Sequence, residues 1–368
     1  MDERELRIVF AGGGTGGHLY PAIAIADQIR EMRPAAALLF VGAKRRIEGR
    51  VIPDRGYDLE TISVSGLSRR LSLKSLMFPF KLLLSLLQSF VILRRFRPHV
   101  VVGTGGYVSG PVVYVASLLG IPTLIQEQNS YPGLTTRLLA GRVDEVHLSF
   151  EETKQYLGKT RREIKVTGNP TRSAIGAIER SSGARFFGMD PKKKTLLVFG
   201  GSLGAVRLND AVLALIGDLI HENVQVLWQT GKSDYQRVKS EAPASNLTVI
   251  VSFIDRMEFA YAASDLVICR AGATTLAEVT RAGIPAILVP YPHAAANHQV
   301  VNAKTLADAG AAVLLREDEL SGDLKQSVLG LLESESRRNE MRAKSLALGK
   351  PKAARELAEA VLRLVRFQ

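Results

Sequence analysis

The fold is decided by Val9-Phe10-Ala11-Gly12-Gly13-Gly14-Thr15-Gly16-Gly17, where a short apolar run passes directly into a glycine-rich turn. A second stretch of the same kind follows near the middle of the chain, Val198-Phe199-Gly200-Gly201-Ser202-Leu203-Gly204. A strand that runs into a glycine turn and then into a helix is typical of doubly wound parallel sheets. The two copies therefore predict two α/β domains.

Short apolar runs alternate with amphipathic segments on both sides of these turns, as expected for repeated strand-helix units. In the first half, strands are expected at Arg7–Ala11, Leu38–Val41, Leu59–Val64, Val100–Val102, Thr123–Ile125 and Glu145–Leu148. In the second half, they are expected at Thr195–Phe199, Gln225–Gln229, Thr248–Val251, Leu266–Ile268, Ala286–Val289 and Ala312–Leu314. Each predicted sheet has the same number of strands.

The boundary between the domains is expected near residue 170. Gly168-Asn169-Pro170 and the polar stretch Arg180–Ala184 contain Asn-Pro and Ser-Gly pairs, which break regular structure. The predicted domains are therefore 1–170 and 171–350. The remaining residues, 351–368, contain a predicted closing helix at Ala353–Arg366, and whether it packs back onto the first domain is open at this stage.

Composition limits the possible partners. A chain of 368 residues with 46% apolar and 23% charged residues can form two cores, and its net charge of +12 favours anionic partners. Nucleic acid is not expected, because aromatic residues make up only 6% and no zinc-finger or RNA-recognition signature is present. Cys269 is the single cysteine, and no Cys/His cluster has metal-ligand spacing. The N-terminus lacks a signal-peptide pattern, which predicts a cytoplasmic protein.

One segment departs from the strand-helix rhythm and predicts a basic amphipathic helix. Its apolar residues recur at three- and four-residue steps, at Leu73, Leu76, Met77, Phe80, Leu83, Leu84, Leu87 and Phe90. Basic residues bracket or interrupt them, at Arg69, Arg70, Lys74, Lys81, Arg94, Arg95 and Arg97. Pro79 and Lys81 break the apolar run, so it is too short to span a bilayer. A helix lying on a membrane surface and a core-facing helix with a basic rim are both compatible with this pattern.

The first glycine turn matches the dinucleotide fingerprint, with Gly12, Gly14 and Gly17 at G-x-G-x-x-G spacing. A dehydrogenase would also have an acidic residue near the end of the next strand, but that region reads Gly42-Ala43-Lys44-Arg45-Arg46. The turn is instead suited to close approach of a phosphate to a helix start, and a tight turn without a ligand is the alternative.

The second glycine turn matches the G-x-S-x-G elbow of serine hydrolases. Ser202, Asp265 and either His293 or His298 could supply the order of a catalytic triad. The HGGG-type oxyanion motif is absent, and a hydrolase would not need the first glycine unit. We therefore interpret Ser202 as a hydroxyl donor beside a helix start that binds a diphosphate.

Two further turns have the same character. In Cys269-Arg270-Ala271-Gly272-Ala273-Thr274-Thr275-Leu276-Ala277-Glu278, a strand passes into a helix start suited to phosphate, and Glu278 can accept both hydroxyls of a ribose. A solvated helix charge is the alternative for Glu278. Gly103-Thr104-Gly105-Gly106-Tyr107-Val108-Ser109-Gly110-Pro111 offers a second backbone site in the first domain, suited to the diphosphate of an acceptor.

Together these residues resemble glycosyltransferase family 28, and in particular its transferases that add N-acetylglucosamine to a lipid-linked muramoyl-pentapeptide of peptidoglycan synthesis. The resemblance covers nearly the whole chain. It is carried by the two glycine turns with His18 and Ala205, by the Gly105–Pro111 turn, and by four further motifs: Gln126-Glu127-Gln128-Asn129, Gly168-Asn169-Pro170-Thr171-Arg172, Arg270-Ala271-Gly272-Ala273-Thr274-Thr275 and Asn297-His298-Gln299.

The resemblance implies a GT-B fold of two Rossmann-like domains and an inverting transfer from UDP-N-acetylglucosamine to lipid I, giving lipid II. It assigns donor binding to Thr15, Gly16, Gly17, Asn129, Arg172, Ser202, Phe253, Met257, Thr275, Glu278, His298 and Gln299. It assigns acceptor binding to Gly14, Thr15, Tyr107 and Asn129. Two positions depart from the family pattern, which commonly has Asn where this chain has Thr136 and Gln-Gln where it has His298-Gln299.

The chemistry of an inverting transfer then suggests roles. His18 is the candidate base for the acceptor's C4 hydroxyl, because a neutral imidazole can take that proton, although it could instead bind a phosphate or sugar. No Asp-x-Asp dyad suited to a nucleotide-bound metal is present, so Arg172, Ser202 and the helix starts are expected to stabilise departing UDP without a required cofactor.

An acceptor with a polyprenyl tail stays in the bilayer, which favours the membrane reading of the basic helix through Leu76, Met77, Phe80, Lys81 and Leu84. The expected location is the cytoplasmic face of the bacterial inner membrane, with an anionic lipid surface as a partner. Partnership with other cell-wall and division enzymes is left open, as is a glycolipid synthase that uses another lipid acceptor.

Overall fold

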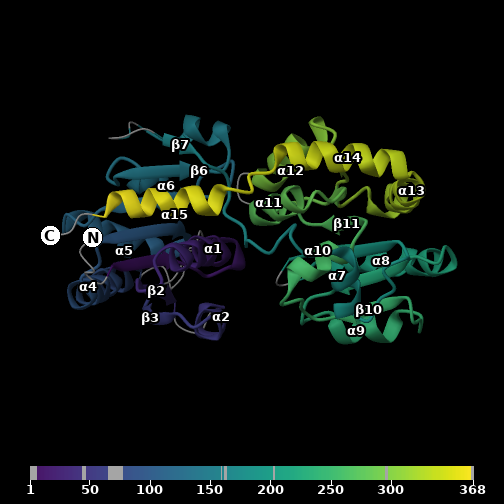
Figure 1. Cartoon of the computed structure of the whole chain (residues 1–368), viewed down its shortest axis with the longest axis horizontal. Coiled ribbons are helices and arrows are strands. Elements are labelled where there is room, and N and C mark those ends of the chain that lie inside the picture. The colour runs from purple at the N-terminus through teal and green to yellow at the C-terminus, as the bar shows by residue number, and fades with distance from the viewer. Residues whose placement is uncertain are drawn as a thin grey trace. The chain divides into compact units, whose positions relative to one another are not determined.

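The structure is a computed structural model that describes residues 6–43, 47–64, 78–158, 160, 164–201, 204–294 and 297–365. Its residues group into two compact units (Figure 1). The first comprises Met1–Arg172 and Lys352–Gln368, and the second comprises Ser173–Pro351. The break after Arg172 lies two residues beyond the boundary expected from the sequence, and the C-terminal segment belongs to the first unit.

The first unit contains a seven-stranded sheet of order β3-β2-β1-β4-β5-β6-β7 in which every pair is parallel. Its strands are β1 (Arg7–Gly12), β2 (Ala37–Ala43), β3 (Asp58–Ile62), β4 (Val100–Gly105), β5 (Thr123–Glu127), β6 (Glu145–Leu148) and β7 (Ile164–Val166). The six expected strands are present with small shifts at their ends. The edge strand β7 was not predicted.

Helices cover both faces of this sheet. They are α1 (Gly16–Met32), α2 (Glu48–Asp54), α4 (Phe78–Phe96), α5 (Gly106–Leu118), α6 (Leu134–Leu139), the 3-10 helix η1 (Glu151–Tyr156) and α15 (Ala353–Leu364). Alternate residues of β1 feed the two cores, because successive strand side chains point to opposite faces. Ile8 and Phe10 lie in one buried cluster with residues of α1 and α15, and Val9 and Ala11 lie in another with residues of α5.

The closing helix α15 packs against α1 of the first unit. Leu357, Val361 and Leu364 are buried in the same cluster as Leu19 and Ile23. The sequence therefore returns to its first unit after completing the second, which answers the question that the sequence left open.

The second unit contains a parallel six-stranded sheet of order β10-β9-β8-β11-β12-β13. Its strands are β8 (Thr195–Phe199), β9 (Gln225–Gln229), β10 (Thr248–Val251), β11 (Leu266–Cys269), β12 (Ala286–Leu288) and β13 (Ala312–Leu314). Its helices are α7 (Arg180–Phe186), α8 (Val206–His221), α9 (Tyr235–Glu241), α10 (Met257–Ala263), α11 (Ala273–Ala282), α12 (His298–Asp308), α13 (Leu320–Glu333) and α14 (Glu335–Leu348). All six strands were expected.

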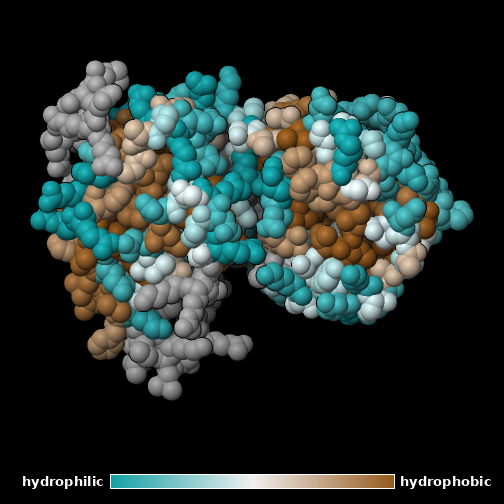
Figure 2. All heavy atoms as spheres, turned by 60° about the horizontal axis from the view of Figure 1, so that its bottom comes forward, coloured by the Kyte–Doolittle hydropathy of each residue, from teal (hydrophilic) through white to brown (hydrophobic). Residues whose placement is uncertain are grey.

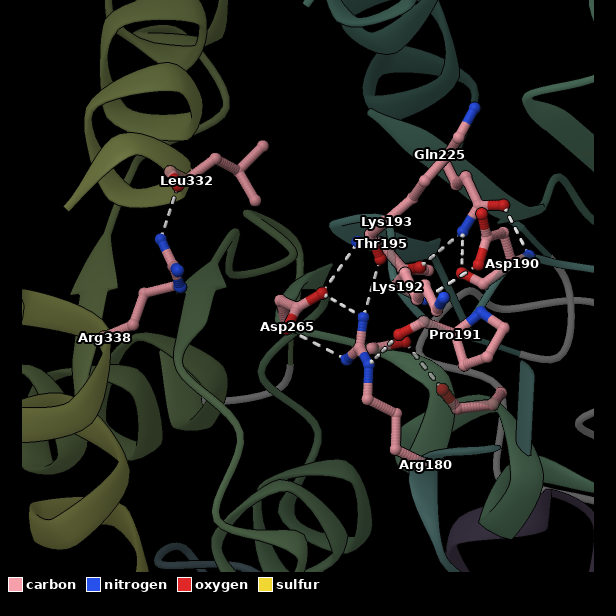
Figure 3. A network of polar contacts seen from close by, with 12 residues as sticks. Arg180, Asp190, Pro191, Lys192, Lys193, Thr195, Gln225, Asp265, Leu332 and Arg338 are labelled. Carbon is pink, nitrogen blue, oxygen red and sulfur yellow. Dashed lines mark hydrogen bonds and ion pairs between the residues drawn. The ribbon is translucent and has the colours of Figure 1, made fainter. Parts of the chain in front are cut away.

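The stretch Arg180–Ala184, expected to be a polar break between domains, is instead the first part of α7, with Gly183 and Ala184 buried. Arg180 explains the difference (Figure 3). Its guanidinium donates two hydrogen bonds to Asp265, at 2.9 and 2.7 Å, and others to the carbonyls of Pro191 and Lys193. A long-range ion pair thus anchors a helix that the local sequence does not favour.

Candidate active-site residues of the two units

In each sheet the strand order reverses between two central strands, and ligands of open α/β sheets bind beyond the carboxyl ends of the strands at such points. In the first unit these strands are β1 and β4, and in the second they are β8 and β11. The glycine turns singled out in the sequence follow these four strands.

The first turn is held by a carboxylate that the sequence did not predict. Glu48 is fully buried at the start of α2, and its Oε1 accepts hydrogen bonds from the backbone N–H groups of Gly14 at 2.9 Å and Ala43 at 3.2 Å. The amide of Gly14 is therefore bound to Glu48 in this structure. At the start of α1 the amides of His18 and Leu19 donate to the carbonyl oxygen of Thr15, at 3.3 and 3.2 Å, which fixes the turn from the other side.

His18 lies in the first turns of α1 and is half-buried. Its Nδ1 lies 3.1 Å from the carbonyl oxygen of Thr104 and 2.8 Å from Oε1 of Gln128. Both partners are acceptors, so Nδ1 carries the proton and Nε2 of the neutral ring keeps its lone pair. In this tautomer Nε2 is the ring nitrogen that can accept a proton.

Gln128 is oriented by the end of the sheet. It is buried directly after β5, and its Nε2 donates to the carbonyl oxygens of Thr104 at 2.8 Å and Gln126 at 3.1 Å. Those bonds leave Oε1 to face His18. Gly105 makes the approach possible, because a Cβ at that position would lie 2.7 Å from Nδ1 of His18.

The segment after β5 is organised by the buried carboxylate of Glu127. Its Oε1 accepts from the backbone and side-chain amides of Asn129, at 3.1 and 3.2 Å. Its Oε2 accepts from the amide of Gly133 at 3.0 Å and the hydroxyl of Thr136 at 2.6 Å. Thr136, where the family commonly has Asn, is thus a buried partner of Glu127 that shapes the segment bearing Asn129.

The other residues predicted in the first unit lie at the same edge of the sheet. Thr15 is the residue before α1, Gly16 and Gly17 begin that helix, and Tyr107 is exposed in the first turn of α5. Arg172 is the last residue of the first unit, with its guanidinium 5.5 Å from the ring centroid of Tyr20 on α1. It was expected to open the second domain.

In the second unit, the glycine turn after β8 packs closely on the neighbouring strand. A Cβ on Gly204 would lie 2.2 Å from the carbonyl oxygen of Thr230, so this position admits only glycine. Gln229 ties the turn to the β10–α10 connection, donating to the carbonyl of Gly201 at 2.9 Å and accepting from the amide of Ile254 at 2.8 Å. Ser202 lies outside the described residues.

Glu278 lies within α11, with its carboxylate 3.0 Å from the hydroxyl of Tyr261, which donates to it. It is largely buried, which excludes the alternative of a solvated helix charge. Burial raises the pKa of the Cys269 thiol and the charge of Glu278 raises it further, so Cys269 stays protonated. Arg270 of the same motif is bound to Glu317 and to the carbonyls of Val289 and Pro290, which gives it a structural role.

The remaining predicted donor residues also belong to the second unit. Phe253 is half-buried in the connection between β10 and α10, Met257 is half-buried as the first residue of α10, and Thr275 is half-buried in the first turn of α11. His298 and Gln299 begin α12, where the side chain of Gln299 accepts a hydrogen bond of 2.9 Å from the amide of Tyr291.

The triad of a serine hydrolase is not assembled. Asp265 directly precedes β11 and is bound to Arg180 and to the amide of Thr195, the first residue of β8 (Figure 3). It therefore lies at the amino ends of these parallel strands, whereas position 202 follows the carboxyl end of β8. A strand of five residues is roughly 16 Å long, so Asp265 cannot orient a histidine at the glycine turn.

Comparison with known families identifies the two units. The N-terminal domain of glycosyltransferase family 28 matches residues 8–148, and its C-terminal domain matches residues 195–359. The chain belongs to glycosyltransferase family 28.

This family-28 chain is similar along nearly its whole length to proteins named UDP-N-acetylglucosamine–N-acetylmuramyl-(pentapeptide) pyrophosphoryl-undecaprenol N-acetylglucosamine transferase. The protein of that name from Chlorobium luteolum is 47% identical, over 98% of this chain and 99% of its own length. The one from Flavobacterium psychrophilum is 40% identical, over 99% of both chains. The crystal structure of Acinetobacter baumannii MurG is 28% identical, covers 98% of this chain and 100% of its own, and has a TM-score of 0.75.

Helix α4 of this family-28 protein presents most of its large apolar side chains outward, and Ile92 and Leu93 near its end are buried. Its buried positions include Ser85 and Ser89, whose hydroxyls donate to carbonyls of the preceding turn. Its large apolar side chains are exposed at Phe80, Leu82, Leu83, Leu84, Leu87, Phe90 and Val91. Phe80 is 73% exposed, which argues against a core-facing helix. Figure 2 shows hydrophobic side chains, in brown, gathered on the flank that carries α4 in Figure 1.

Lys81 is half-buried on the same helix, and Arg94, Arg95 and Arg97 are exposed at its end. The predicted membrane residues Leu76 and Met77 lie outside the described residues. Across the ranges described above, no helix is both long and apolar enough to cross a membrane.

The sequence analysis assigned no individual role to three side chains that shape the candidate site of this family-28 protein. Glu127 is the last residue of β5, and Gln128 follows it directly. The rule that sites form at the carboxyl ends of parallel strands could therefore have found both. The sequence signal for Glu48 was weaker. An acidic residue of the dehydrogenase type was sought near the end of the second strand, and Glu48 lies just beyond the basic stretch at 44–46 found there. Within the residues that the structure describes, no three His, Cys, Asp or Glu side chains are grouped as metal ligands.

Proposed function

We propose that this chain transfers N-acetylglucosamine from UDP-N-acetylglucosamine to the C4 hydroxyl of the muramoyl sugar in undecaprenyl-diphospho-muramoyl-pentapeptide, forming lipid II. The observation that carries the proposal is 40–47% identity along 98–99% of the chain to transferases named for this reaction. Because the match extends over both units, it includes the glycine turns and His18 together. The geometry of His18 gives independent support.

His18 acts as the general base in this proposal. The acceptor's C4 oxygen attacks the anomeric carbon, the bond from that carbon to the β-phosphate oxygen of UDP breaks, and the configuration inverts. The proton of the hydroxyl passes to Nε2 of His18. The hydrogen bonds from Nδ1 to Thr104 and Gln128 support this role. They hold the ring in the tautomer whose Nε2 is unprotonated, and they stabilise the charged ring that forms.

The second unit is assigned the donor. The carboxylate of Glu278 binds the ribose hydroxyls, Phe253 and Met257 border the uracil, and Thr275, His298 and Gln299 bind the diphosphate and sugar. Burial of Glu278 beside the Tyr261 hydroxyl supports the ribose assignment, because a fixed carboxylate can accept two hydroxyls without further ordering.

Departing UDP carries negative charge that must be stabilised. We assign this to the guanidinium charge of Arg172, a hydrogen bond donated by the hydroxyl of Ser202, and the partial positive charge of the helix starts. The first unit contributes Thr15, Gly16, Gly17 and Asn129 beside the reacting groups, with Gly14 and Tyr107 on the acceptor side. No metal or other cofactor is required in this scheme.

The protein is proposed to act at the cytoplasmic face of the bacterial inner membrane, held by the outward apolar face of α4. The net charge of +12 and the exposed arginines at the end of this helix favour anionic lipid. Such binding places the enzyme where an acceptor with a polyprenyl tail resides.

The test is a transfer assay with radiolabelled UDP-N-acetylglucosamine, purified protein and the lipid-linked muramoyl acceptor, with EDTA present. We expect labelled lipid that depends on both substrates and is unaffected by the chelator. Diacylglycerol is the comparison acceptor, since a glycolipid synthase would label it instead. Loss of transfer in EDTA that added Mg²⁺ restores would contradict the cofactor-free scheme.

A further inference from the structure

The first unit contains an apolar groove beside the turn assigned to the acceptor diphosphate. The groove has a volume of about 560 Å³ and lies among α4, α5 and α6. Its walls are mainly carbon, with Leu82 and Leu86 from α4, Pro111 and Tyr114 from α5, and Leu134 and Leu138 from α6. We call it the α5 groove. Among the residues assigned above to the reaction and its substrates, Tyr107 lines the groove, whereas His18 and Asn129 do not.

One end of the α5 groove opens at the glycine turn. Tyr107 and Gly110, in the first turns of α5, line this end together with Thr135. The hydroxyl of Thr135 donates to the carbonyl of Gly106 at 3.3 Å, so the groove begins at the backbone of the turn itself. Gly106 is next to Gly105, where the chain approaches the imidazole of His18. A ligand whose diphosphate occupied the turn would have its next atoms at the mouth of the groove.

The groove leads away from the turn along α5. The seven steps along the helix from Tyr107 to Tyr114 correspond to a rise of about 10 Å. At the far end, Arg142 is exposed, with its guanidinium 5.4 Å from the ring centroid of Tyr114. On the α4 side, Leu82 borders the exposed face formed by Phe80, Leu83 and Leu84. A chain leaving the groove therefore meets an apolar face and a cation, as at a lipid surface with anionic headgroups.

We propose that the α5 groove binds the isoprene units of the acceptor that are nearest its diphosphate. This rests on the proposed function, in which the acceptor is a pyrophosphoryl-undecaprenol. In that molecule the branched apolar chain begins directly at the diphosphate, which matches a groove that begins directly at the turn. The acyl chain of an ordinary phospholipid has no such link to the turn. Binding here selects a prenyl acceptor before the rest of its tail enters the bilayer.

The experiment measures kcat/KM without membranes for soluble muramoyl-pentapeptide diphosphates that carry a methyl group or one, two or three isoprene units. Leu134→Gln and Leu138→Gln alter the groove at positions that are 49% and 68% exposed, so the fold should tolerate both. Leu118→Gln is the matched control, because Leu118 is 62% exposed on α5 and does not line the groove.

For the unaltered protein we expect kcat/KM to rise with the first isoprene units. The groove variants should lose about tenfold with the prenyl acceptors, as expected for an apolar contact replaced by an amide, and should match the unaltered protein with the methyl acceptor. Leu118→Gln should keep the full dependence on chain length. Circular dichroism and melting temperature verify that all three variants are folded.

Two results would overturn the inference. One is an unchanged dependence on chain length in both folded groove variants. The other is equal activation by straight saturated alkyl chains of matched length, which would indicate a groove for any apolar chain. Failure of the proposed function is distinguishable, because the unaltered protein would then transfer no sugar to any of these acceptors, the methyl compound included.

Discussion

Replacing Gln128 with leucine removes one of the two acceptors that keep the proton of His18 on Nδ1. Leucine is similar in size, so the main change is polar. The carbonyl of Thr104 remains as an acceptor, at 3.1 Å against 2.8 Å for Gln128. Without Gln128, the ring can more readily turn or adopt the other tautomer, in which Nε2 carries the proton and cannot act as a base.

The magnitude follows from the hydrogen bond that is lost. A net contribution of about 1 to 1.5 kcal/mol to the productive arrangement corresponds to about a tenfold loss of kcat. Removing the base altogether, in His18→Ala, should reduce kcat by about a hundredfold to ten-thousandfold. Gln128 is buried, so the variant should also be less stable by about 1 to 3 kcal/mol, because the carbonyls of Thr104 and Gln126 each lose the hydrogen bond that Gln128 donates.

The assay is transfer to a soluble short-chain acceptor, measured for each single variant and for the pair. If Gln128 acts through His18, then Gln128→Leu should change kcat by less than about twofold when His18 is already alanine. Gln88→Leu is the matched control, because Gln88 accepts a hydrogen bond of 2.7 Å from the amide of Ser63 and is not bonded to His18. An equal tenfold loss in both His18 backgrounds would refute the reasoning.

Three further predictions follow from the first unit. Glu48→Ala should lower the free energy of unfolding by about 2 kcal/mol in urea titrations, because the buried amide of Ala43 and the amide of Gly14 lose the carboxylate that accepts from both, whereas an unchanged midpoint would mean that these bonds contribute nothing. Phe80→Ser combined with Leu84→Ser should weaken binding to anionic vesicles at least about tenfold in sedimentation assays while transfer to a soluble acceptor persists, and equal sedimentation would exclude α4 as the membrane contact. Burial lowers the pKa of His147 below 6.5 despite its hydrogen bond with Glu145, so the unfolded chain binds a proton first as pH falls, and stability should drop between pH 6.5 and 5.5 by at most about 1 kcal/mol. His147→Gln should reduce that drop, and an identical pH profile would contradict the assignment.

The strands could be predicted because a parallel strand buried on both faces is a continuous apolar run. Leu196, Leu197 and Val198 of β8, for example, are all fully buried. The edge strand β7 was missed because it has three half-buried residues with Lys165 at its centre, which gives no apolar run. The helix α7 was missed because its anchor is Asp265, which lies 85 residues further along the chain.

The location of the candidate site was readable, since glycine turns after central strands mark the carboxyl edge of a parallel sheet. The hydrogen bonds within the site could not be predicted from the sequence. Gln128 is 110 residues from His18, and Glu48 is 34 residues from Gly14, so no local spacing links either pair. Periodicity also could not decide which side of α4 faces the core. The structure places Ser85 and Ser89 inward together with Ile92 and Leu93 near the end of the helix, and it leaves Leu82, Leu83, Leu84 and Leu87 outward.

The central claim is that the protein catalyses an inverting transfer of one N-acetylglucosamine to the lipid-linked muramoyl sugar. The most direct measurement is nuclear magnetic resonance of the product formed by the purified protein from UDP-N-acetylglucosamine and that acceptor. We predict a single new β-linkage at C4 of the muramoyl sugar, with UDP released in equal amount. An α-linkage, attachment at another hydroxyl, or release of UDP without a sugar-bearing lipid would contradict the account.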